Sequence, residues 1–345
     1  MNVSLLPKEP VLLIGGSGVV GTVAAKTLRK LQPELPITIG ARDLRKAERV
    51  AEQIGGTEVA QIDLERPDLG LSGEKKFSAV SMFIKDKSLH SLKYAQKEGI
   101  PYQNISGAAI ELSPEIAHFV NHPTSAPILM NSYWLAGTVT LAILSIAREF
   151  SSVDSIKIAA LLDEQDVGGP AAYDDFKRLS KAGPYALMLK DGKWNWSVDD
   201  DRMRQFESVD GMVFQGEAYS APLDVAGLAV ATNAKSIRFD FALGETASRR
   251  RGEPFSIETI IEINGEKQNG LFGNFRYEIV HPKGQVPMTA LGVAVGLERL
   301  LGLVGAPPSV KAGLYFPEML IEPSYMIQRL KEFGTNISHR IIKKD

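Results

Sequence analysis

The sequence predicts an α/β protein with two parts: an N-terminal doubly wound parallel sheet and a C-terminal α+β domain whose sheet is largely antiparallel. The first third of the chain alternates short apolar runs with segments of helical periodicity, which is typical of right-handed βαβ units. Val11–Ile14 is apolar throughout, as expected of a strand buried on both faces, and it leads into a glycine-rich turn. Beyond about Ala136 this alternation ends, and strand-like runs separated by turn residues follow.

Six strands are expected in the first part, over residues 11–14, 37–39, 59–62, 77–84, 100–105 and 127–131. The helix after the first strand ends before Pro33, and Asp43 is positioned to cap the next helix, which Gly55 and Gly56 end. A further helix is expected over residues 88–98, closed by Gly99. These elements assign residues 1–135 to the first domain.

The second part, residues 136–300, is expected to begin with a helix over 135–150. Four strand-like runs follow, over residues 156–162, 237–243, 256–263 and 275–280. Asn264-Gly265 lies between the last two runs and predicts a type I′ hairpin turn there. Residues 289–301 and 324–333 are expected to form helices.

Composition limits the class of protein. Length alone favours two domains, and 39 basic against 41 acidic residues give a net charge of −2, which argues against nucleic acid as the main partner. The chain has no cysteine, which excludes disulfides and cysteine-based metal sites. The first ten residues have no signal-peptide pattern and no apolar run is long enough for a membrane span, so we expect a cytoplasmic protein without a membrane partner.

A glycine motif follows the first strand: Gly16, Ser17, Gly18, Val19, Val20 and Gly21 match G-x-G-x-x-G between a strand and an amphipathic helix. We expect Gly16 to permit a tight turn, Gly18 to let a diphosphate approach backbone N–H groups, and Gly21 to let helix and strand pack closely. The helix N-terminus then carries partial positive charge toward the phosphates. The alternative is that these glycines serve only the geometry of the turn. The other signatures of kinases and P-loop proteins are absent from the sequence.

A basic residue follows the second strand, where NAD-binding proteins usually have an acid that binds the ribose 2′-hydroxyl. Here that residue is Arg42, which suits the 2′-phosphate of NADP. NADP is therefore the favoured cofactor, although the neighbouring Asp43 leaves NAD open. Asp63, after the third strand, is expected near the adenine or in a solvated turn.

With these features the chain resembles the saccharopine dehydrogenase-like NAD(P)-dependent oxidoreductases. The resemblance is carried by residues 11–21, 41–47 and 95–104, by Pro317-Glu318, and by Leu330 and Gly334. It implies a Rossmann domain, a substrate and dimerisation domain forming a homodimer through its sheet, and C-terminal helices in 301–345 that fold back toward the first domain. It also implies hydride transfer at an amino-acid-derived C–N bond or, in some relatives, at an enoyl or other C=C bond.

The sequence departs from the family pattern at two places. The small-residue and proline stretch that usually follows the fourth strand is replaced by residues 81–87, and the Pro-Gly that opens the interdomain helix is replaced by Ala136-Gly137. The resemblance therefore carries over the cofactor site, but neither the substrate nor the proton donor.

Candidate catalytic residues follow from the rule that ligands bind outside the carboxyl ends of parallel strands. They are Lys85 and Tyr133, which follow the fourth and sixth strands, and His90, one turn into a helix. Phe83 is expected either to pack on the nicotinamide ring or to lie in the core.

Two other motifs resemble catalytic or metal-binding patterns. Tyr173-x-x-x-Lys177 imitates the catalytic pair of short-chain dehydrogenases but lies beyond the first domain, and His118 and His122 have metal-ligand spacing without an adjacent acid. We expect no metal. The sequence thus predicts an NADP-dependent oxidoreductase acting on a C=N, C–N or C=O bond of an amino-acid-like small molecule in an interdomain cleft. An extended short-chain or enoyl-reducing enzyme and a non-catalytic NADP-binding sensor remain open.

Overall fold

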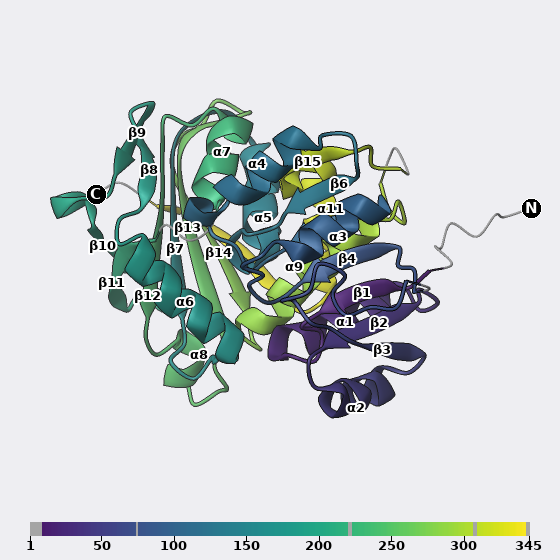
Figure 1. The fold of residues 1–345 in the computed structure, drawn as a ribbon. Helices are drawn as coiled ribbons and strands as arrows, with labels where there is room; N and C mark the ends of the chain where they lie inside the picture. The colour runs from purple at the N-terminus through teal and green to yellow at the C-terminus, as the bar shows by residue number, and fades with distance from the viewer. Residues whose placement is uncertain (1–8, 74, 220–222, 306–308, 343–345) are drawn as a thin grey trace, which may run out of the picture.

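The computed structural model describes residues 9–73, 75–219, 223–305 and 309–342, so residues 1–8 of the N-terminal segment lie outside it. Within these ranges, seven parallel strands form the first sheet in the order β15-β6-β5-β4-β1-β2-β3 (Figure 1). The strands are β1 (Val11–Ile14), β2 (Ile37–Ala41), β3 (Thr57–Gln61), β4 (Ala79–Met82), β5 (Tyr102–Asn104), β6 (Pro127–Met130) and β15 (Gly313–Tyr315). The predicted doubly wound parallel sheet is therefore confirmed.

Helices cover both faces of this sheet. One face carries α1 (Val19–Leu31), α2 (Leu44–Ile54) and the long helix α9 (Gln285–Leu300), and the other carries α3 (His90–Glu98) and α4 (Ser113–Asn121). A short 3-10 turn, η1 (Ala109–Glu111), precedes α4. The strands are apolar on both sides because both faces are covered.

The second sheet is mixed but mostly antiparallel, with the main order β10-β11-β12-β7-β13-β14-β16. Only the β7–β12 pair is parallel among the described strands. The strands are β7 (Phe150–Leu162), β8 (Leu187–Lys190), β9 (Lys193–Trp196), β10 (Met203–Glu207), β11 (Val213–Ala218), β12 (Ser236–Leu243), β13 (Ile257–Lys267), β14 (Phe272–His281) and β16 (Asn336–Ile342). The predicted α+β second part with a largely antiparallel sheet is thus confirmed.

Its helices are η2 (Trp134–Gly137), α5 (Thr138–Ala147), α6 (Pro170–Ala182), η3 (Asp199–Asp201), α7 (Asp224–Thr232) and α8 (Ala247–Arg250), with α10 (Pro317–Leu320) and α11 (Pro323–Glu332) near the end. None of the helices in the described ranges combines the length and hydrophobicity that crossing a bilayer requires.

The predicted hairpin turn at Asn264-Gly265 is wrong. Both residues lie inside β13, opposite Asn274 and Gly273 of β14, and the connection comes after Lys267. A Cβ on Gly265 would lie 2.3 Å from the carbonyl oxygen of Ser152, and the pairing of β13 with β7 shifts register here. The glycine therefore marks a bulge and a close backbone approach, which the sequence does not distinguish from a turn.

The chain after residue 300 contributes one strand to each sheet. β15 pairs with β6 at the edge of the first sheet, and β16 pairs with β14 at the edge of the second. Between these strands, α11 packs on α5 through the buried side chains of Met326 and Leu330.

α9 joins the two cores (Figure 1). Met288, Leu291 and Val295 belong to the core of the second part, whereas Val293 and Leu297 belong to that of the first sheet. The helix is therefore apolar around most of its circumference, as expected of one buried on all sides.

Two glycines let α9 approach neighbouring groups closely. A Cβ on Gly292 would lie 2.3 Å from the carbonyl oxygen of Ala136, and one on Gly296 would lie 2.1 Å from Oε1 of Gln103. The buried carboxylate of Asp166 accepts a hydrogen bond from the backbone N–H of Gln285 at 2.7 Å and caps the start of the helix.

The connection from β6 to α5 is a left-handed turn. Leu135, Ala136 and Gly137 have φ of 51°, 53° and 80°, which is unfavourable for the first two because they carry a Cβ. The turn is held from α7 by the fully buried Asp224, which accepts hydrogen bonds from the Trp134 backbone N–H at 2.7 Å and from the Thr140 hydroxyl. Burial raises the pKa of Asp224 to about 7.

Asp224→Asn is expected to weaken the pH dependence of stability. The folded-state pKa lies above the unfolded one, so between about pH 4 and 7 the folded protein binds the extra proton and loses stability as pH rises. Wild type should lose on the order of 1 kcal/mol more per pH unit than the variant, measured by urea unfolding at several pH values. Parallel curves for the two proteins would contradict the assignment.

Candidate functional site

The glycine loop leaves the end of β1 in a tight turn. Its left-handed residue is Gly15, with φ +84°, so Gly15 rather than Gly16 makes the turn. Gly16 donates its N–H to the carbonyl oxygen of Leu13 at 3.0 Å, and a Cβ there would lie 2.8 Å from that oxygen. Gly18 donates to the carbonyl of Gly15 at 2.9 Å. Both glycines thus permit a backbone course that a side chain would disturb.

Gly21 faces this turn from the first turn of α1. A Cβ on Gly21 would lie 2.5 Å from the carbonyl oxygen of Gly15 and 2.6 Å from Cα of Gly16. The close helix–strand packing predicted for the third glycine of the motif is therefore present.

The N-terminus of α1 is open to an anion. Gly18 occupies the N-cap without a side-chain hydrogen bond, and the first turn contains no acidic residue. Helix geometry leaves the N–H groups of Val19, Val20 and Gly21 without partners inside the helix. Ser17 and Val19 are accessible beside them. These backbone donors fit a diphosphate, because the positive end of the helix dipole faces the same point.

The other predicted cofactor residues surround the ends of β2, β3 and β4. Arg42 is exposed directly after β2, and Asp43 caps α2 by accepting from the Lys46 N–H at 3.3 Å. Asp63 is exposed and accepts from the N–H of Glu65 at 3.0 Å. Phe83 is buried in the core beside α1 and α9. Contact of these four side chains with a dinucleotide stays a prediction.

An ion network lies beyond the ends of β4 and β5. Glu111 pairs with Lys85 at 3.0 Å through one carboxylate oxygen and with Arg178 through the other. Arg178 also pairs with Asp175 at 2.5 Å, and Asp175 accepts a hydrogen bond from the Ser106 hydroxyl at 2.9 Å. Lys85 follows Ile84 in the sequence. The Ile84 side chain lies 3.0 Å from the position that a Cβ on Gly15 would occupy, so the network lies close to the glycine loop.

The sequence predicted only Lys85 of these charged groups as a site residue. Asp175 and Arg178 lie three residues apart on α6, which is the spacing of any solvated ion pair on a helix, so their sequence carries no signal of a site. Burial raises the pKa of Glu111, but the hydrogen bonds from Arg178 and Lys85 outweigh it and hold the pKa below its usual range. Glu111 is therefore an anion at neutral pH.

α6 bridges the two parts of the molecule. Its Asp175 and Arg178 reach residues after β5, while its Phe176 packs on the aromatic rings of Tyr219 and Phe241 from the second sheet, 6.3 and 5.7 Å away. The loop before α6 also meets the glycine loop, since a Cβ on Gly169 would lie 2.8 Å from Cγ2 of Val19. The helix thus lies over the carboxyl ends of the strands of the first sheet, where the glycine loop also lies.

The Tyr173-x-x-x-Lys177 pair lies on the outward side of α6. Tyr173 is 59% exposed, and the Lys177 ammonium lies 5.7 Å from the centre of its ring. Neither side chain shares the face that carries Asp175 and Arg178, because the helical period turns them toward solvent.

The other two predicted catalytic residues, Tyr133 and His90, make hydrogen bonds to groups outside the ion network. Tyr133 is buried and donates its hydroxyl to Glu318 at 3.0 Å. Burial and the nearby carboxylates raise the pKa of Tyr133 far above its usual value. His90 is bonded through Nδ1 to the carbonyl oxygen of Leu64 at 2.8 Å. Tyr133, His90 and Lys85 therefore have different partners, and catalytic roles for Tyr133 and His90 stay predictions.

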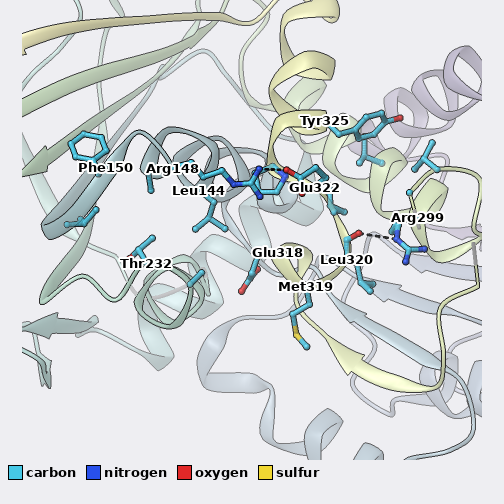
Figure 2. A pocket seen from close by; sticks show the side chains of 18 of the residues that line it. Leu144, Arg148, Phe150, Thr232, Arg299, Glu318, Met319, Leu320, Glu322 and Tyr325 are labelled. Atoms are coloured by element: carbon cyan, nitrogen blue, oxygen red, sulfur yellow. Dashed lines mark hydrogen bonds and ion pairs between the residues drawn. The ribbon is translucent and has the colours of Figure 1, made fainter. Parts of the chain in front are cut away.

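A cavity of about 690 Å³ lies elsewhere, among α5, α9, α10 and α11. Figure 2 shows Arg148 turned toward Glu322 at this cavity, and Arg299 bonded through Nε to the Leu320 carbonyl oxygen at 3.0 Å. Arg299 lies fourteen residues along α9 from Gln285, which is about 21 Å of helix. Because Gln285 is the end of α9 near the α6 loop, this cavity is remote from the glycine loop.

Comparisons with known proteins give a match of fold. Apo saccharopine dehydrogenase (L-Glu forming) from Saccharomyces cerevisiae has a TM-score of 0.72 at 12% identity, covering 97% of this chain and 100% of that one. A myo-inositol dehydrogenase from Corynebacterium glutamicum has a TM-score of 0.48 at 12% identity, with 98% of this chain and 100% of that chain covered. No family model and no curated protein matches the sequence. The predicted resemblance to the saccharopine dehydrogenase type is thus confirmed at the level of the fold.

Gly21→Ala tests the packing at the glycine loop. The new methyl group would overlap the Gly15 carbonyl, so the variant should lose about 1–3 kcal/mol of unfolding free energy in denaturant titrations. Gly73→Ala is the matched control, since no neighbouring atom lies within 4 Å of its Cβ position and its φ is not in the left-handed region. Equal stability of the two variants would show that the contact does not constrain the loop.

Proposed function

We propose that this protein is an NAD(P)-dependent oxidoreductase that prefers NADP and acts on an amino-acid-like small molecule. The observation that carries the proposal is the uncapped N-terminus of α1 behind the Gly15–Gly18 turn, where backbone N–H groups are available to bind an anion. The fold shared with saccharopine dehydrogenase supports it. In such a sheet the crevice for the dinucleotide lies between the ends of β1 and β4, where the strand order reverses.

The preference for NADP rests on Arg42. Its side chain is exposed at the end of β2, where a ribose would lie, and among the described residues it has no acidic partner. Asp43, the acid next to it in the sequence, is used as the cap of α2. A guanidinium in this place suits a 2′-phosphate better than a 2′-hydroxyl.

The substrate class rests on the charges of Lys85, Glu111, Asp175 and Arg178. Two cations and two anions, each 21–28% exposed, lie together beyond β4 and β5. Such a set suits a zwitterion, with the substrate carboxylate toward the two cations and the substrate ammonium toward Asp175. The reaction proposed is hydride transfer to or from the carbon of a C–N or C=N bond.

The chain's own residues would hold the substrate and exclude water. When bound, the nicotinamide supplies or accepts the hydride. Lys85 and Arg178 would fix a substrate carboxylate, and α6 would cover the reacting groups, because its ion pairs connect it to the first sheet. Lys85 is the predicted catalytic residue that this geometry supports best.

Arg42→Ala is expected to lower NADPH affinity by one to two orders of magnitude, about 1.4–2.8 kcal/mol, and to leave NADH affinity little changed. Calorimetric titration of both nucleotides measures the difference. Arg45→Ala, another exposed arginine at the start of α2, is the control and should keep both affinities. Equal losses for both nucleotides in Arg42→Ala would remove the 2′-phosphate argument, and no heat from either with wild type would overturn the cofactor site.

Turnover is tested by mixing the protein with NADPH, keto acids and amines, and following the absorbance of the reduced nicotinamide. Consumption with an amino-acid-like pair is expected. Tight NADPH binding without consumption for any pair would instead indicate a nucleotide-binding sensor.

A further inference from the structure

A carboxylate already lies between the two cations of the ion network. Glu111 places one oxygen on Lys85 and the other on Arg178, so it bridges two positive groups from opposite parts of the molecule. Lys85 comes from the end of β4, and Arg178 comes from α6 of the second part. A bound substrate carboxylate would make the same two contacts.

The cations need such an anion. The side chains of Lys85, Glu111 and Arg178 are 22%, 21% and 28% exposed, so each is partly shielded from water. Arg178 keeps Asp175 as a partner, but Lys85 has no other ion pair among the described residues, so the loss of Glu111 would leave Lys85 unpaired and the site favours a carboxylate in this place. In the ligand-free chain that carboxylate is Glu111.

The turn that carries Glu111 lies at the surface between two buried residues. η1 is a three-residue 3-10 turn in which no residue is buried, and Ile110 beside Glu111 is 39% exposed. The flanking residues Ala108 and Leu112 are buried and anchor the backbone, so Glu111 would leave the cations by turning its side chain toward solvent. Glu111 can therefore leave the cations without movement of the backbone when another carboxylate replaces it.

Arg178 stays in place when Glu111 leaves. Its other guanidinium nitrogen is bonded to Asp175 at 2.5 Å, and Asp175 is itself held by the Ser106 hydroxyl at 2.9 Å. Asp175 is thus a positioning residue that keeps Arg178 over the end of β5. Other acids near Lys85, namely Asp86 and Glu115, are engaged elsewhere: Asp86 caps α3 through Ser91, and Glu115 accepts from Asn104.

We propose that Glu111 is an internal mimic of the substrate carboxylate, which binds to Lys85 and Arg178 only by displacing it. This inference rests on the proposed function, because it assigns the substrate end that these cations recognise. Lys85 and Arg178 then determine specificity for a carboxylate. Glu111 lowers the apparent affinity of carboxylate ligands, which bind only to the fraction of molecules in which Glu111 has left the cations.

Glutarate is a suitable probe because it has carboxylates and no group that can react. Its binding is measured by calorimetry on the full chain, with and without saturating NADP, for wild type, Glu111→Gln and Arg178→Met. Glu111→Gln is expected to bind glutarate about tenfold more tightly than wild type, and Arg178→Met should bind it at least tenfold more weakly. Glu48→Gln, an exposed residue of α2, is the matched control and should equal wild type.

The direction of the change separates a mimic from a structural latch. If Glu111 only held α6 closed, its removal would weaken glutarate binding, and that result, or no change, would overturn the proposal. Glu111→Asp provides a second measurement. Its carboxylate lies one methylene closer to the backbone and should contact the two cations less well, so its glutarate affinity should lie between those of wild type and Glu111→Gln. NADP titration of each variant distinguishes this proposal from the proposed cofactor site. If Glu111→Gln binds NADP as wild type does but does not bind glutarate more tightly, only the proposal for Glu111 is wrong. If glutarate binds more tightly but no variant binds a nucleotide, only the cofactor site is wrong.

Discussion

The close contact between α9 and the backbone that joins the two sheets determines the arrangement of the molecule. Gly292 and Gly296 let the helix lie against Ala136 and Gln103 so closely that a Cβ on either glycine would overlap these neighbours. From that position α9 contributes apolar side chains to both cores, and the two parts therefore share one buried helix instead of meeting at an ordinary interface. Neither core is complete without it.

This arrangement also sets the geometry of the candidate site. The start of α9 is capped by Asp166, in the loop that continues to Gly169 and α6. That loop touches Val19 at the glycine loop, and α6 then crosses to the residues after β5. The anchoring of one helix thus fixes the distance between the backbone N–H groups at the start of α1 and the charged groups beyond β4 and β5.

The sequence predicts well those strands and glycine contacts that have a strong local pattern. β1, β2 and β6 were expected where they occur, because buried apolar runs between turn residues are hard to misplace, and Gly21 was assigned its packing role from motif context. The hairpin at Asn264-Gly265 was misplaced because a bulge and a turn both select glycine. β15 has three residues, too few for a periodic pattern, and Glu111, Asp175 and Arg178 become neighbours only through the fold. Such contacts depend on long-range packing, which residue spacing does not encode.

The two late strands have a consequence for biosynthesis. β15 completes the first sheet and β16 the second, and α9 must be present before either core is closed. A nascent chain that has released only its first 135 residues from the ribosome therefore exposes one face of β4 and β6 that α9 later covers. Folding during translation must wait for the last third of the chain, and until then the unfinished N-terminal half presents apolar surface suited to chaperone binding.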